Sequence, residues 1–128
     1  MNAHETILKK FYAALAKLEF KGILADAALN VTFQIPGKGK LAGKYDAKTF
    51  ESELGVKMRE LGGEHFNFEM HELMTSDRHA MVLGTVKLTR KGKALEYRTA
   101  HIWRIEDGKP LAGYEYPRDL YQYDMIWE

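Results

Sequence analysis

The sequence has no cysteine among its 128 residues, which excludes disulfide bonds, thiol catalysis and metal sites built from thiolates. It also has no excess of charge of either sign: 19 Lys and Arg stand against 18 Asp and Glu, a formal net charge of +1. A nucleic-acid surface needs clustered basic residues, so this balance argues against a polyanionic partner. No apolar run approaches the roughly 20 residues of a transmembrane helix. The sequence therefore predicts no nucleic-acid partner and no membrane partner.

Targeting and metal-binding signals are missing as well. Polar residues, among them His4 and Glu5, interrupt the apolar centre that a secretory signal would need, so we expect a cytoplasmic protein. The five histidines have no compact spacing with carboxylates, which predicts no metal site, and we expect no cofactor. With 45% hydrophobic residues, the chain is expected to form one domain over residues 1–128.

The first half of the chain predicts helices and one short strand. Apolar side chains recur at helical spacing over residues 7–18, and residues 23–29 are expected to form a second short helix. Residues 31–35 alternate apolar and polar side chains, as a strand does. A third helix is predicted from an N-cap at Asp46 to the glycine pair at residues 62–63.

From His65 onward the pattern changes to a period of two, which predicts an antiparallel meander. Lys91-Gly92 is typical of a two-residue hairpin turn. Such a turn would pair Leu95 with Leu88 and His101 with Val82, so that the apolar faces of the two strands coincide. This pairing places His101 on the inward face.

The stretch from Thr99 to Glu115 predicts a second hairpin, with an imidazole and a carboxylate on its buried face. Glu106-Asp107-Gly108 ends in glycine, as three-residue loops with a left-handed third residue do. This loop would pair Thr99 with Glu115 and turn both inward, beside His101. A two-residue loop would instead turn Glu115 to the opposite face, because a one-residue slip reverses every side chain.

The opposite face of the predicted sheet is apolar for a surface in contact with water. Its apolar residues would be Met81, Leu83, Ala100, Ile102, Tyr114 and Tyr116. Patches of this kind are typical of protein interfaces. We therefore expect a homodimer formed through this outer sheet face.

Several strings of residues resemble one family. They are Pro36-Gly37 followed by Leu41-Ala42-Gly43-Lys44-Tyr45, His101-Ile102-Trp103-Arg104-Ile105-Glu106-Asp107-Gly108, Glu115-Tyr116-Pro117-Arg118-Asp119, and the terminal Asp124 to Trp127. With the order of the predicted elements, they resemble the SnoaL-like branch of the nuclear transport factor 2-like superfamily, whose relatives include polyketide cyclases and ketosteroid isomerase. The resemblance implies an α+β cone, in which three N-terminal helices pack into a curved, mainly antiparallel sheet with a pocket at its open end.

The resemblance also bears on activity. Ketosteroid isomerase uses an Asp base, with a Tyr and a protonated Asp as its oxyanion hole. The corresponding positions here are Ile35, Phe11 and His101, which excludes a steroid isomerase of that design. The cyclase of the SnoaL-like branch uses a carboxylate acid/base with a nearby His, roles that resemble those of Glu115 and His101, although the cyclase has Asp where this chain has Glu.

The sequence supports two interpretations and leaves open whether the protein is an enzyme. In the favoured one, a water-filled pocket of roughly 200–600 Å³ serves a cofactor-free isomerase, cyclase or hydrolase that acts on an apolar carbonyl or cyclic compound. Glu115 would transfer the proton, and His101 would orient it or polarise the carbonyl. In the alternative, the protein is a non-catalytic ligand-binding or protein-interaction module with a buried Glu–His pair. The residues expected to line the ligand site are Thr99, Trp103, Tyr97, Phe33, Phe11, Tyr12 and Ile35.

Overall fold

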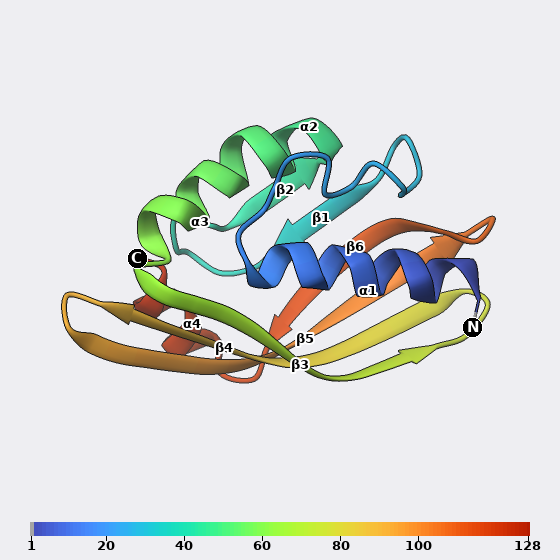
Figure 1. The fold of residues 1–128 in the computed structure, drawn as a ribbon. Coiled ribbons are helices and arrows are strands. Elements are labelled where there is room, and N and C mark those ends of the chain that lie inside the picture. Colours follow the sequence, from blue (N-terminus) through green and yellow to red (C-terminus); the bar gives the residue numbers. More distant parts are fainter. Residues whose placement is uncertain (1) are drawn as a thin grey trace.

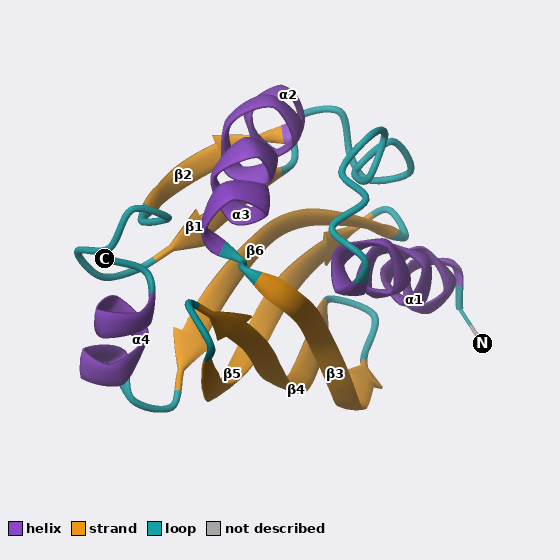
Figure 2. Ribbon diagram, turned by 60° about the vertical axis from the view of Figure 1, so that its left-hand side comes forward, coloured by secondary structure: helices purple, strands orange, loops and turns teal. Residues whose placement is uncertain are grey.

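A curved six-stranded sheet with helices on its concave side forms the fold (Figures 1 and 2). The computed structural model describes residues 2–128. Its elements are α1 (Ala3–Ala16), β1 (Thr32–Ile35), β2 (Gly43–Asp46), α2 (Ala47–Thr49), the π-helical η1 (Phe50–Leu54), α3 (Gly55–Leu61), β3 (Glu64–Thr75), β4 (His79–Arg90), β5 (Lys93–Glu106), β6 (Lys109–Pro117) and α4 (Leu120–Ile126). The strand order is β2-β1-β6-β5-β4-β3, with β1 and β6 parallel and the other neighbours antiparallel. The predicted α+β class is confirmed.

Helices α1 and α2 begin at N-cap residues, of which the sequence predicts Asp46. The Asn2 side chain accepts the Glu5 N–H at the start of α1. Asp46 and Thr49 form a reciprocal capping box at the start of α2, which satisfies N–H groups that the first helical turn leaves unpaired. From Ala47 the chain stays helical through α2, η1 and α3 to Leu61, so the third predicted helix is confirmed.

Residues 23–29 do not form the predicted second helix. The N–H groups of Ile23, Ala25 and Ala27 each bond to the carbonyl three residues earlier, as in successive turns. Gly22, at φ 66°, precedes them. A segment of about seven residues cannot offset the cost of nucleating a helix by its own hydrogen bonds, and here burial of its apolar side chains holds it as turns against the core.

The β4–β5 hairpin has the predicted register. Leu88 pairs with Leu95 and Val82 with His101. His101 lies on the inward face and is 4% exposed, so the prediction from the Lys91-Gly92 turn is confirmed.

The β5–β6 hairpin differs from the predicted one in two ways. Glu106 pairs with Lys109, so the turn has two residues, Asp107 and Gly108, both at positive φ. The strand β6 then carries one extra residue, because Ile105 pairs with Pro110 but the preceding Arg104 pairs with Ala112. The shorter turn and the extra residue each shift the register by one residue in the same direction. Because a shift of two residues returns a side chain to the same face, Glu115 still points inward. His101, and not Thr99, therefore lies opposite Glu115.

The outer face of the sheet carries two apolar rows across three strands. One row is Met81, Ile102 and Tyr114, and the next is Leu83, Ala100 and Tyr116. Leu83 and Tyr116 are 38% and 54% exposed. The predicted apolar outer face is thus present in the fold.

None of the helices in residues 2–128 has the length and apolar character needed to cross a membrane.

Candidate functional site

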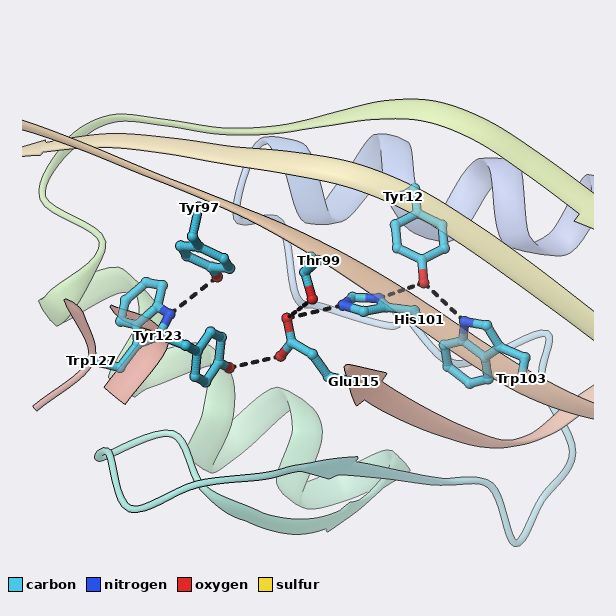
Figure 3. A network of polar contacts seen from close by, with 8 residues as sticks. All are labelled: Tyr12, Tyr97, Thr99, His101, Trp103, Glu115, Tyr123 and Trp127. Carbon is cyan, nitrogen blue, oxygen red and sulfur yellow. Dashed lines mark hydrogen bonds and ion pairs between the residues drawn. The ribbon is translucent and has the colours of Figure 1, made fainter. Parts of the chain in front are cut away.

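The carboxylate of Glu115 is the centre of a buried polar network (Figure 3). Its Oε2 accepts a hydrogen bond from the Thr99 hydroxyl at 2.8 Å, and its Oε1 accepts one from the Tyr123 hydroxyl at 2.7 Å. His101 Nε2 lies 3.3 Å from Oε2. Three neighbours from β5 and α4 thus surround a carboxylate that β6 carries into the core.

These neighbours and the burial of the side chain determine the charge state of Glu115. Burial raises the pKa of the carboxyl, but the imidazole of His101 and the hydroxyls of Tyr123 and Thr99 outweigh burial, so the pKa lies below its usual value. Burial, reinforced by the Glu115 charge, raises the pKa of Tyr97 and of Tyr123 well above the usual range. At neutral pH the site therefore holds a carboxylate among neutral phenols.

Nδ1, on the other edge of the His101 ring, takes part in a second set of hydrogen bonds. Tyr12 Oη, from α1, lies 2.6 Å from His101 Nδ1, and Trp103 Nε1 donates to Tyr12 Oη at 2.9 Å. The rings of Phe33 and Phe68 lie 5.1 Å and 5.4 Å from the imidazole centre. His101 is therefore fixed by packing on its faces and by polar contacts at both nitrogens.

His101 Nε2 is the exception to an otherwise satisfied network. Among the described residues, it is the buried side-chain polar atom that has no hydrogen-bond partner. It is near Glu115 but is not aligned with it as a hydrogen bond requires. An unsatisfied buried polar atom is costly, and such atoms are uncommon in native structures.

A small cavity lies beside His101 and Glu115, with a volume of about 30 Å³. A water molecule occupies about 10–15 Å³, so the cavity is large enough for water. Its walls are apolar apart from Tyr97, His101, Glu115 and Tyr123, and the other side chains include Phe11, Phe33, Ile35, Phe50, Leu54, Met58 and Phe68. This cavity is much smaller than the predicted water-filled pocket of roughly 200–600 Å³, because aromatic side chains from α1, β1, β3 and η1 fill the concave side of the sheet.

The structure separates the expected ligand-site residues into two groups. Tyr97, Phe33, Phe11 and Ile35 line the cavity together with His101 and Glu115. The others are buried behind it and act on its polar residues: Thr99 on Glu115, and Tyr12 and Trp103 on His101.

Tyr123 is a site residue that the sequence pattern did not single out. It comes from the C-terminal helix α4. The available signal was its spacing to Ile126 and Trp127, three and four residues on, which puts the three side chains on one helix face. All three are buried.

The C-terminal helix is tied to the loop between β1 and β2. The Lys38 N–H donates to the Asp124 carboxylate at 3.0 Å, and the Lys40 N–H donates to the Trp127 carbonyl. Arg90 donates to the Ile126 carbonyl at 2.7 Å and also to the carbonyl at the end of α3. These bonds hold helix α4 in place at the end of the cavity that Tyr123 lines.

Within residues 2–128, no three side chains of the metal-binding types come close enough together to hold an ion.

The comparisons with known proteins agree with this architecture. The model of the SnoaL-like domain matches residues 8–110, and no curated protein is significantly similar to the chain. Among solved structures, Bal32a from a soil-derived mobile gene cassette is 22% identical over 98% of this chain and 97% of its own, with a TM-score of 0.84. An NTF2-like protein from Burkholderia thailandensis is 21% identical over 100% and 98%, with a TM-score of 0.83.

A third solved structure was determined with a small molecule. TerC, co-crystallised with polyporic acid, is 19% identical over 98% of this chain and 99% of its own, with a TM-score of 0.80. At these identities the solved structures bear on the fold alone. The domain match covers most of the chain, so the chain belongs to the SnoaL-like family.

Proposed function

We propose that the protein binds a small, largely apolar molecule that carries a carbonyl or comparable oxygen, in the cavity beside His101 and Glu115. The observation that carries this proposal is the combination of a buried carboxylate and an imidazole nitrogen without a hydrogen-bond partner at one apolar cavity. Apolar walls with a few convergent polar groups are typical of small-molecule sites. Membership of the SnoaL-like family supports the same conclusion.

The chemistry that these groups can perform is proton transfer. Glu115 is ionised at neutral pH, since its pKa is lowered, and it can accept a proton from a carbon next to a carbonyl. The lowered pKa makes it a weak base, so the C–H bond must be acidified by a hydrogen bond from His101 to the carbonyl oxygen. Return of the proton to another carbon would be an isomerisation. If the deprotonated carbon instead bonds to a second carbonyl carbon of the ligand, whose oxygen takes the proton, the step would be a ring closure.

Binding requires the cavity to enlarge beyond its volume of about 30 Å³. Met58 in the cavity wall has an unbranched, flexible side chain, and side-chain rearrangement is common when ligands bind. TerC, a protein of similar fold, was co-crystallised with polyporic acid, which supports a small-molecule role for this fold.

The small volume also favours a second candidate, a non-catalytic ligand-binding or interaction module. In that case Glu115 and His101 are a structural pair, and Glu115 already has hydroxyl donors on both of its oxygens. The two candidates differ in whether a proton is transferred to and from the ligand, which can be measured directly.

A thermal-shift screen of cyclic ketones, lactones and aromatic polyketide-like compounds, polyporic acid included, tests the binding. A ligand at 100 times its Kd stabilises the folded state by about 2.7 kcal/mol. We expect at least one compound to stabilise the wild type and the surface control Glu96→Gln equally, and to stabilise His101→Gln less. Equal stabilisation of all three proteins would place the ligand elsewhere.

Deuterium incorporation into the bound ligand tests the chemistry. In D₂O the wild type is expected to catalyse exchange of the ligand's acidic C–H, and Glu115→Gln, which keeps the volume but removes the base, is expected to lose it. Exchange that persists in Glu115→Gln contradicts the assignment of the base. A ligand that binds the wild type without exchange supports the non-catalytic candidate.

We also propose that two copies associate through the outer sheet face. Leu83 and Tyr116 are exposed at the two ends of one apolar row, on either side of Ala100, and apolar surface of this kind is typical of interfaces. Light scattering at micromolar concentration is expected to give twice the mass of one chain for the wild type, and the mass of one chain for Leu83→Lys. A wild type with the mass of one chain would contradict the dimer.

A further inference from the structure

The hydroxyl of Tyr12 connects two ring N–H groups of the core, and its hydrogen bonds can be counted. The indole nitrogen of Trp103 is a donor only, so at 2.9 Å the Tyr12 oxygen accepts from it. Tyr12 has a single hydroxyl proton, and its oxygen lies 2.6 Å from His101 Nδ1. Within residues 2–128 the hydroxyl has no third hydrogen-bond partner, and Tyr12 is 2% exposed.

This count decides the direction of the Tyr12–His101 contact. If Nδ1 carried a proton, it would donate to the Tyr12 oxygen, and the hydroxyl proton of Tyr12 would be buried without an acceptor. Such an unsatisfied group costs about 1–3 kcal/mol. If Nδ1 is unprotonated, the Trp103 N–H, the Tyr12 O–H and the Nδ1 lone pair are all satisfied (Figure 3).

The opposite edge of the ring requires the same tautomer. Glu115, as a carboxylate, only accepts hydrogen bonds, and its Oε2 lies 3.3 Å from His101 Nε2. An unprotonated Nε2 would put its lone pair next to that negative charge. The proton of a neutral imidazole is therefore favoured on Nε2 at both edges of the ring.

We infer that Tyr12, oriented by Trp103, is a positioning residue that holds His101 as the Nε2–H tautomer at the cavity wall. Which ring nitrogen carries the proton is set by the hydrogen bond at the other nitrogen, and here that bond comes from α1. In the proposed function this assigns His101 the role of hydrogen-bond donor to the ligand's oxygen, and it leaves Glu115 as the acceptor of the proton. The assignment of roles rests on the proposed function, whereas the tautomer is a property of the free protein.

Nitrogen NMR of the full chain labelled with ¹⁵N-histidine, without ligand and at pH 8.5, tests this inference. His101 is identified by the signals that disappear in His101→Gln. We expect a protonated Nε2 and an unprotonated Nδ1, with the Nδ1 resonance displaced to lower frequency by the hydrogen bond that it accepts. A protonated Nδ1, an even mixture of tautomers or a doubly protonated ring at this pH would overturn the inference.

Tyr12→Phe tests the source of the effect. It removes the hydroxyl and keeps the ring, so the Nδ1 resonance is expected to move to higher frequency. The matched control is Tyr45→Phe, which removes another buried hydroxyl, one that donates to the Leu41 carbonyl; it is expected to leave the His101 signals unchanged. An unchanged Nδ1 resonance in Tyr12→Phe, or equal displacement in the two variants, would overturn the role of Tyr12. The wild-type spectrum tests the tautomer even if Tyr12→Phe folds poorly, and the ligand screen does not depend on it.

Discussion

His101→Phe is expected to lower the free energy of unfolding by about 3–5 kcal/mol at pH 7, because it leaves Glu115 as an uncompensated buried charge. The phenyl ring fills most of the space of the imidazole but has no nitrogen. Glu115, which is 7% exposed, would remain a buried carboxylate without its imidazole neighbour. The Tyr12 hydroxyl would lose its acceptor as well, which adds to the loss.

Urea denaturation measures this loss, and His4→Phe is the matched control. His4 is also buried, but its Nε2 contacts the backbone carbonyl of Ser76 at 2.8 Å, and within residues 2–128 it forms no ion pair with a carboxylate. The free energy of unfolding is expected to fall less in His4→Phe, by about 1–2 kcal/mol. The double variant His101→Phe/Glu115→Gln is expected to recover part of the loss, because it removes the orphaned charge. A loss below about 1 kcal/mol in His101→Phe would show that the pair does not stabilise the fold.

The same variant should change how stability depends on pH. In the wild type the folded pKa of Glu115 lies below that of the unfolded chain, about 4.3. The carboxylate therefore contributes stability above that pH, and the contribution is lost as the pH falls through the folded pKa. Without the imidazole, burial raises the pKa of Glu115 with less opposition. The difference in free energy of unfolding between wild type and His101→Phe should therefore be largest near neutral pH and shrink below about pH 4. A stability difference that does not change with pH would contradict an electrostatic origin of the loss in His101→Phe.

Local patterns in the sequence predicted the parts of the fold that depend on neighbouring residues. The cap at Asp46, the Lys91-Gly92 turn and the inward position of His101 each follow from a few adjacent residues, and each is present. The short strand β2 was not predicted, because Gly43–Asp46 has no alternating apolar pattern and only Tyr45 is buried. Its pairing with β1 is a tertiary contact.

The site was predicted less completely, because it depends on register and on distant contacts. Glu115 faces inward as predicted, although the turn is shorter than predicted and an extra residue in β6 restores its orientation. Extra residues of this kind are set by how the whole sheet bends. The links from Tyr12 to His101 and from Tyr123 to Glu115 join different elements of the fold. No local pattern indicates how far aromatic side chains fill the predicted pocket.

The closing helix α4 provides the second large expected effect. Trp127 is fully buried, donates from its indole nitrogen to the Tyr97 hydroxyl at 3.1 Å, and lies under the Arg90 guanidinium at 5.7 Å. Trp127→Ala is expected to lower the free energy of unfolding by about 3–5 kcal/mol, as truncation of large core aromatics does. Because α4 also carries Tyr123, the loss should extend to the hydrogen bond that Tyr123 makes with Glu115.

Urea denaturation and amide hydrogen exchange together check this prediction. Tyr121→Ala is the control, because it removes an aromatic side chain from the same helix that is 78% exposed, and surface changes of this kind stay within about 0.5 kcal/mol. Exchange at α4 and at the loop of residues 36–43 should speed up in Trp127→Ala and not in the control, since the Lys40 N–H bonds to the Trp127 carbonyl. If Trp127→Ala were as stable as Tyr121→Ala, α4 would not be packed as part of the core, and the cavity at Glu115 would be open to solvent at this end.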